Sequence, residues 1–133
     1  MRSYLPLLAR VLLGLIFVMS GLTKITGFEA TQQQMASQGM PLTAVFLVGA
    51  IVVEILGGLS VILGLWARAG AAALVLFLIP ATLIFHTDFS QQTQMVMFLK
   101  NLSIMGGLLL VLAFGSGPYR IRALTESDEV AYA

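Results

Sequence analysis

The chain has 133 residues, of which 59% are hydrophobic and 10% are charged, and its mean hydropathy is +0.98. Soluble domains carry about 25% charged residues, so this composition excludes a water-soluble globule, and its hydrophobicity excludes intrinsic disorder. Seven basic and six acidic residues form no basic patch, which excludes a nucleic-acid-binding protein. Without cysteine, the chain cannot hold a disulfide, an iron–sulfur cluster, a thiolate zinc site or a covalent c-type haem.

Four apolar stretches are long enough to cross a membrane, which requires about 20 mostly apolar residues. Each stretch is bounded by glycine, proline or charged residues of the kind that end a helix. We therefore predict an all-α fold, an integral membrane four-helix bundle that residues 1–133 form as a single domain. The predicted spans cover residues 5–25, 42–65, 67–86 and 94–114.

The segments outside the spans indicate how the chain is oriented. Residues 28–38 (FEATQQQMASQ) are too polar to span, so we predict a short interfacial helix or an ordered loop between the first two spans. Short loops rich in arginine lie on the cytoplasmic side, and this rule predicts cytoplasmic N- and C-termini, with residues 116–133 as a polar cytoplasmic tail. The arginines that carry this prediction are Arg2, Arg68, Arg120 and Arg122.

Ionisable residues inside the spans are the candidate functional residues, because each is costly in a membrane unless it is paired or hydrated. In the first span, spacings of three and four residues place a set of side chains on one stripe, which is expected to face the bundle. This stripe consists of Arg10, Gly14, Phe17, Gly21 and Lys24. The buried polar cluster, or candidate ligand site, is predicted to contain Arg10, Lys24, Glu54, His86, Lys100 and Asn101.

Glu54 is the central residue of this cluster, because it lies near the middle of the second span. At about 1.5 Å per residue, Arg10 should lie about 9 Å to its cytoplasmic side and Lys100 about 9 Å to its outer side. We expect Glu54 to be ionised and paired with Arg10, Lys100 or both, because an unpaired buried carboxylate would neutralise. Two interpretations of Glu54 stay open: a structural ion pair, or a ligand, quinone or proton site. Arg10 and Lys24 are also near enough to helix ends to snorkel to the head groups.

Small residues on the same faces predict close contacts between helices. On the fourth span, Ser103 and Gly107 share the face of Lys100, so this helix carries a polar stripe edged with small residues. The glycines predicted at helix contacts are Gly14, Gly21, Gly57, Gly58 and Gly107. The sequence shows no nucleophile–base pair, metal-ligand spacing or phosphate loop, so we predict no catalytic residue and no metal site, and an enzyme acting alone is the least favoured interpretation.

Five segments carry a resemblance to known proteins between about residue 8 and residue 119: ARVLLGLIFVMSGLTKITGFEAT, QQMASQGMP, VEILGGLSVILGLWAR, ATLIFH and MFLKNLSIMGGLLLVLAFGSGPY. On these segments the chain resembles the DoxX family of small bacterial membrane proteins. The resemblance implies a four-span protein of the bacterial inner membrane and an association with membrane redox systems. By the same resemblance, the namesake relatives look like small subunits of a thiosulfate:quinone oxidoreductase, and actinobacterial relatives are associated with a superoxide dismutase and a sulfurtransferase.

Three functions follow as hypotheses. The first is an accessory component of a membrane oxidoreductase, in which Glu54, His86 and Lys100 hydrogen-bond the carbonyls of a quinone or relay protons. The second is a non-catalytic assembly or binding protein that docks another membrane or periplasmic component, for which a membrane or periplasmic redox partner is one candidate. The third is a carrier for a small solute or a proton, which four short spans without inverted repeats would support only in an oligomer, and the sequence leaves a homo-oligomer open.

Overall fold

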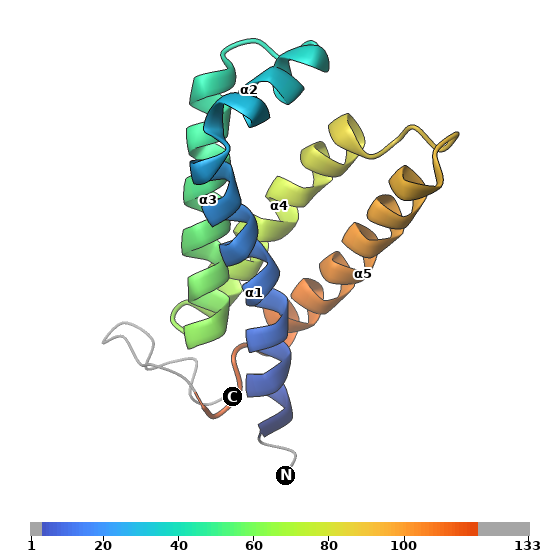
Figure 1. The fold of residues 1–133 in the computed structure, drawn as a ribbon. Helices are drawn as coiled ribbons and strands as arrows, with labels where there is room; N and C mark the ends of the chain where they lie inside the picture. Colours follow the sequence, from blue (N-terminus) through green and yellow to red (C-terminus); the bar gives the residue numbers. More distant parts are fainter. Residues whose placement is uncertain (1–3, 120–133) are drawn as a thin grey trace.

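The computed structural model describes residues 4–119, and within that range the chain forms five α-helices and no β-strand (Figure 1). The helices are α1 (Tyr4–Thr26), α2 (Phe28–Ser37), α3 (Thr43–Leu63), α4 (Ala67–Phe85) and α5 (Gln92–Phe114). All except α2 are long and apolar enough to cross a membrane, which confirms the predicted all-α membrane fold with four spans. The connection between the first two spans is the short helix α2. Arg2 and residues 120–133, which include most of the predicted tail, lie outside the described residues.

The four long helices end within two residues of the predicted span ends, and the turn between α3 and α4 shows how the sequence sets such an end. Gly64 follows α3 in the left-handed conformation (φ 73°), and its N–H donates to the carbonyl of Ser60. Glycine takes this conformation without steric cost, which makes it the usual residue after a helix. The hydroxyl of Ser60 donates to the carbonyl of Leu65 at 2.5 Å, so the turn is held from within. α4 therefore returns directly beside α3.

The helices form a chain of neighbours rather than a symmetric bundle. α1 packs along α3, α3 packs against α4, and α4 packs against α5, whereas α1 and α5 touch over a much smaller area. Figure 1 shows α4 and α5 diverging from α1 and α3 toward the end of the molecule that carries α2. The helices meet more closely at the end near the first residues of α1. This arrangement leaves one end of the bundle packed and the other end open.

The close contact between α1 and α3 depends on glycine. A Cβ atom added to Gly14 would lie 2.6 Å from the carbonyl oxygen of Gly58, and one added to Gly58 would lie 2.9 Å from the carbonyl oxygen of Gly14. A Cβ atom added to Gly21 would lie 2.5 Å from Cγ1 in the side chain of Ile55. Because apolar side chains gain little by leaving lipid for another helix, such close backbone packing is a main source of helix association in membranes. The structure also places Gly57 against Leu74 and Gly107 against Leu13.

A small core and a large apolar outer surface complete the fold. Phe17, Val61, Leu74 and Leu108 are at most 3% exposed and pack together between the helices. Many other large apolar side chains face outward, such as Leu76 at 69% exposure. An apolar exterior of this extent is suited to the acyl chains of a bilayer and not to water.

We predict that Gly14→Ala destabilises the protein, because the new methyl group would collide with the backbone of α3, which cannot move aside. The expected loss in the free energy of unfolding is about 1–3 kcal/mol, the usual cost of overpacking. The measurement is reversible unfolding in mixed detergent micelles. Gly106→Ala is the matched control, because nothing lies within 4 Å of a Cβ added at that glycine. Equal stability of the two variants would contradict a glycine-dependent contact between α1 and α3.

Candidate functional site

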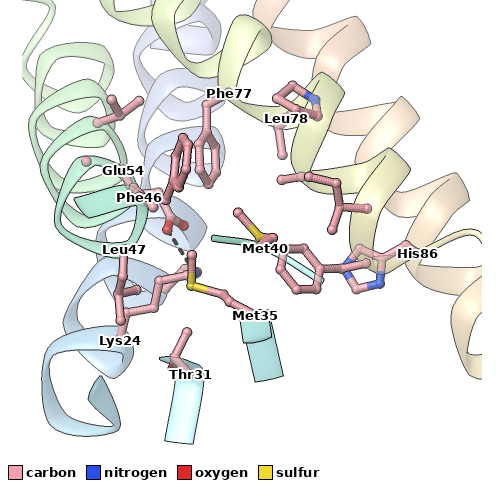
Figure 2. Close-up of a pocket in the computed structure, with 18 of the residues that line it drawn as sticks. Lys24, Thr31, Met35, Met40, Phe46, Leu47, Glu54, Phe77, Leu78 and His86 are labelled. Atoms are coloured by element: carbon pink, nitrogen blue, oxygen red, sulfur yellow. Dashed lines mark hydrogen bonds and ion pairs between the residues drawn. The ribbon is translucent and has the colours of Figure 1, made fainter. Parts of the chain in front are cut away.

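A cleft of about 1060 Å³ lies at the open end of the bundle, lined by residues of all five helices (Figure 2). Its walls are mainly apolar and include the rings of Phe46 of α3 and Phe77 of α4 (Figure 2). The polar residues in the walls are few and include most of the predicted cluster. Those cluster members are Lys24, Glu54, His86, Lys100 and Asn101.

Two of these residues form an ion pair between α1 and α3. The Nζ of Lys24 lies 2.8 Å from Oε1 of Glu54, and the two side chains are 25% and 3% exposed. Lys24 Nζ also donates to the hydroxyl oxygen of Ser20 at 2.7 Å. The lysine is thus held by one residue on its own helix and by one on α3.

This pairing corrects the expectation that Glu54 meets Arg10 or Lys100. The contacts of Gly14 with Gly58 and of Gly21 with Ile55 fix the antiparallel register of α1 on α3. In that register the end of α1 lies beside the middle of α3, so Lys24 reaches Glu54. Depth estimates based on equal spans could not show this offset, because they place the end of α1 level with the start of α3.

Arg10 lies away from the cleft, at the packed end of the bundle. It is 1% exposed, so it does not snorkel to the head groups. The guanidinium donates to the carbonyls of Val61 and Ile62, each at 3.4 Å, and to the carbonyl of Tyr119. These acceptors include the last turn of α3, where the helix dipole favours a cation. Arg10 therefore ties the end of α3 to the segment that follows α5.

The remaining predicted residues come from α4 and α5. His86 follows the last residue of α4, and its Nδ1 lies 3.3 Å from Oε1 of Gln94 on α5. Asn101 is buried and donates its amide N–H to Oγ1 of Thr82 at 3.0 Å. Lys100 lines the cleft and is an exposed residue. The cleft therefore gathers five of the six predicted residues and leaves Arg10 outside.

The face that α5 buries is not the face of Lys100, although Lys100 lines the cleft. α5 buries Asn101, Leu108 and Val111, whereas Lys100 and Ser103 are exposed. The cause is the arrangement of the helices: α5 packs mainly on α4 and barely touches α1, so only the face toward α4 is covered. Gly107 lies at the edge of that face, against Leu13 of α1.

Sequence reasoning missed several residues of the cleft. Ser20 stands one helical turn before Lys24, and that spacing of four residues was the signal that could have identified it. Met35 of α2 is 5% exposed, and with Met40 it lines the cleft from the side opposite α4. α2 was expected at the interface, and nothing in its polar composition predicts that one of its side chains is buried in the site.

The fold and the cleft define the class of this protein: an α-helical membrane protein with four spans and charged residues within its membrane-spanning part. The chain belongs to the DoxX family, whose model matches residues 5–87. No solved structure matches the chain.

Curated relatives agree with this assignment. The chain is 38% identical to "Inner membrane protein YqjF" of Escherichia coli (strain K12) over 118 residues, 89% of each chain. It is 33% identical to "Inner membrane protein YphA" of the same organism over 121 residues, 87% of this chain and 86% of the relative. It is 40% identical to "Putative oxidoreductase CatD" of Bacillus subtilis (strain 168) over 75 residues, 56% of this chain and 54% of the relative. The chain is therefore a multi-pass inner-membrane protein.

A double-mutant cycle on Lys24 and Glu54 should measure the ion pair. We predict that Lys24→Met and Glu54→Gln each lower the free energy of unfolding by about 1–3 kcal/mol. This range lies below the cost of breaking a fully buried pair, because Lys24 is 25% exposed. The double variant should lose about 1 kcal/mol less than the sum of the single losses.

The control is a second cycle on Glu54→Gln and Lys100→Met, in which the two losses should add. Coupling of Glu54 to Lys100 without coupling to Lys24 would contradict the pairing. Unfolding in mixed micelles serves both cycles.

Proposed function

We propose that this chain is an accessory, quinone-associated component of a membrane redox system and that the cleft receives the quinone head group. The observation that carries the proposal is one cleft, in a membrane protein, that combines apolar aromatic walls with several hydrogen-bond donors. Ligand sites are typically apolar clefts with a few placed polar groups. The name of the Bacillus subtilis relative, which includes the word oxidoreductase, supports the same direction.

The residues of the cleft fit the chemistry of a quinone. A quinone has two carbonyl oxygens that accept hydrogen bonds and a flat apolar ring. The ammonium groups of Lys24 and Lys100 donate hydrogen bonds, and an imidazole such as that of His86 donates or accepts according to its tautomer. The rings of Phe46 and Phe77, which both line the cleft, offer faces against which a flat ring packs (Figure 2). When bound, a quinone would supply the redox chemistry, because it takes up electrons and protons and releases them again.

The side chains around the ligand have separate roles in this proposal. Ser20 and Glu54 hold the ammonium of Lys24 in place, so that it donates from a fixed position. Gln94 contacts Nδ1 of His86, so in this proposal the other ring nitrogen is the one that meets the ligand. His86 is the group that passes protons to or from the ligand in this proposal. The electrons come from a membrane or periplasmic redox partner, because a chain without cysteine has no thiol couple of its own.

The proposal includes an orientation in the inner membrane. Arg10 and Arg68 lie toward the packed end of the bundle, near the start of α1 and the turn before α4. Lys24, Glu29 and Asp88 lie toward the open end, so within residues 4–119 the arginines mark the packed side. The positive-inside rule then places both termini in the cytoplasm and opens the cleft toward the outer half of the membrane.

A non-catalytic assembly function is the second candidate, and the ion pair is the observation that favours it. Glu54 is almost fully buried and already has Lys24 as a counter-charge, which a purely structural contact between α1 and α3 also requires. In that case the glutamate would stabilise the fold and no quinone would bind. A measurement of quinone binding therefore distinguishes the two candidate functions.

We predict saturable binding of a short-chain benzoquinone to the purified chain in lipid nanodiscs. His86→Leu removes a hydrogen-bonding group and should weaken binding by up to about tenfold, the usual value of one hydrogen bond. Ser103→Ala, on the exposed face of α5, is the control and should bind like the unchanged chain. If the folded protein takes up quinone only as the empty nanodisc does, the quinone proposal is wrong and the assembly function is favoured.

The orientation is tested by single cysteines, which report cleanly because the chain has none. We predict that a membrane-impermeant maleimide labels Ser90→Cys, in the loop before α5, on intact spheroplasts. Ala69→Cys, in the first turn of α4, should react only after the membrane is permeabilised. The reverse labelling pattern would contradict the proposed orientation.

A further inference from the structure

The charges that line the cleft do not balance. Glu54 is the only carboxylate in the described wall, and Lys24 neutralises it at 2.8 Å. The other acidic residues within positions 4–119, Glu29 and Asp88, do not line the cleft. Lys100 therefore carries a positive charge that the cleft walls do not compensate.

The position of Lys100 makes this charge significant. It is the ninth residue of α5, which places it about 12 Å from the start of that helix. Within the described part of the chain, no carboxylate lies within ion-pair distance of its ammonium. Attraction between opposite charges is stronger between apolar walls than in water, so this ammonium favours a ligand with a negative head group.

The rest of the cleft favours an apolar tail on that ligand. Phe46 and Leu47 of α3 and Phe77 and Leu78 of α4 all line the cleft (Figure 2). Its volume of about 1060 Å³ suits a molecule at the upper end of the size range for small ligands. The phosphates of bilayer lipids stay at the membrane surface, whereas Lys100 is the ninth residue of a membrane-spanning helix, and a single excess charge matches one monovalent anion.

We infer that the cleft binds the carboxylate of a long-chain lipophilic acid, with Lys100 as its ion-pair partner. The alkyl chain of the acid lies against the apolar walls between α3 and α4. This inference rests on the charge balance of the cleft and not on the binding of a quinone. Lys100 is then the residue that makes the cleft bind an acid more tightly than the corresponding neutral lipid.

The test uses palmitic acid labelled with carbon-13 at the carboxyl group and the full chain in phosphatidylcholine nanodiscs. A bound carboxyl resonance that saturates with palmitate is expected, and methyl palmitate should give no saturable binding. Lys100→Gln should weaken palmitate binding about tenfold to a hundredfold, as the loss of a charge-assisted hydrogen bond does. Lys100→Arg, which keeps the charge, should retain binding within about threefold, and Ser103→Ala should leave it unchanged.

Three results would overturn the inference. They are equal binding of the acid and its ester, unchanged palmitate affinity in Lys100→Gln, and saturable binding of phosphatidylglycerol in place of palmitate. A quinone titration of the same samples keeps the two proposals separate. Palmitate binding without quinone binding refutes only the proposed function, and the converse refutes only the inference.

Discussion

The ion pair between Lys24 and Glu54 is the interaction on which the rest of the structure depends. A carboxylate that is 3% exposed among apolar helices is tolerated only with a counter-charge, since its solvation by water is lost. Lys24 supplies that charge because Gly14 and Gly21 let α1 approach α3 in one register. The ion pair and the glycines thus support each other, and together they fix the wall of the cleft from which α4 and α5 diverge.

The two ends of the bundle use their charges differently. At the packed end, Arg10 is surrounded by backbone carbonyls of α3 and of Tyr119, so its charge serves the fold. At the open end, Lys24 has a carboxylate partner, whereas Lys100 has none among the described residues. The ionic groups available to a ligand are therefore at the open end, where the cleft separates the helices.

Much of the fold could be predicted from the sequence, because apolar stretches of spanning length and glycine stops are local signals. The inward stripe of α1 could be predicted too, since helical spacing alone places Arg10 and Phe17 on one face, and both are buried. The partner of Glu54 could not, because it depends on how far α1 slides along α3. The buried face of α5 could not either, because it depends on which neighbours the helix has and not on its own pattern.

The most direct test of this account is the ionisation state of Glu54 in the membrane. An infrared difference spectrum between the unchanged chain and Glu54→Gln, recorded in lipid at neutral pH, isolates this one side chain. The account predicts that the substitution removes the stretching bands of an ionised carboxylate, as an ion pair with Lys24 requires. Loss of the carbonyl band of a protonated acid would contradict it, because Glu54 would then be buried as a neutral group without need of a cation.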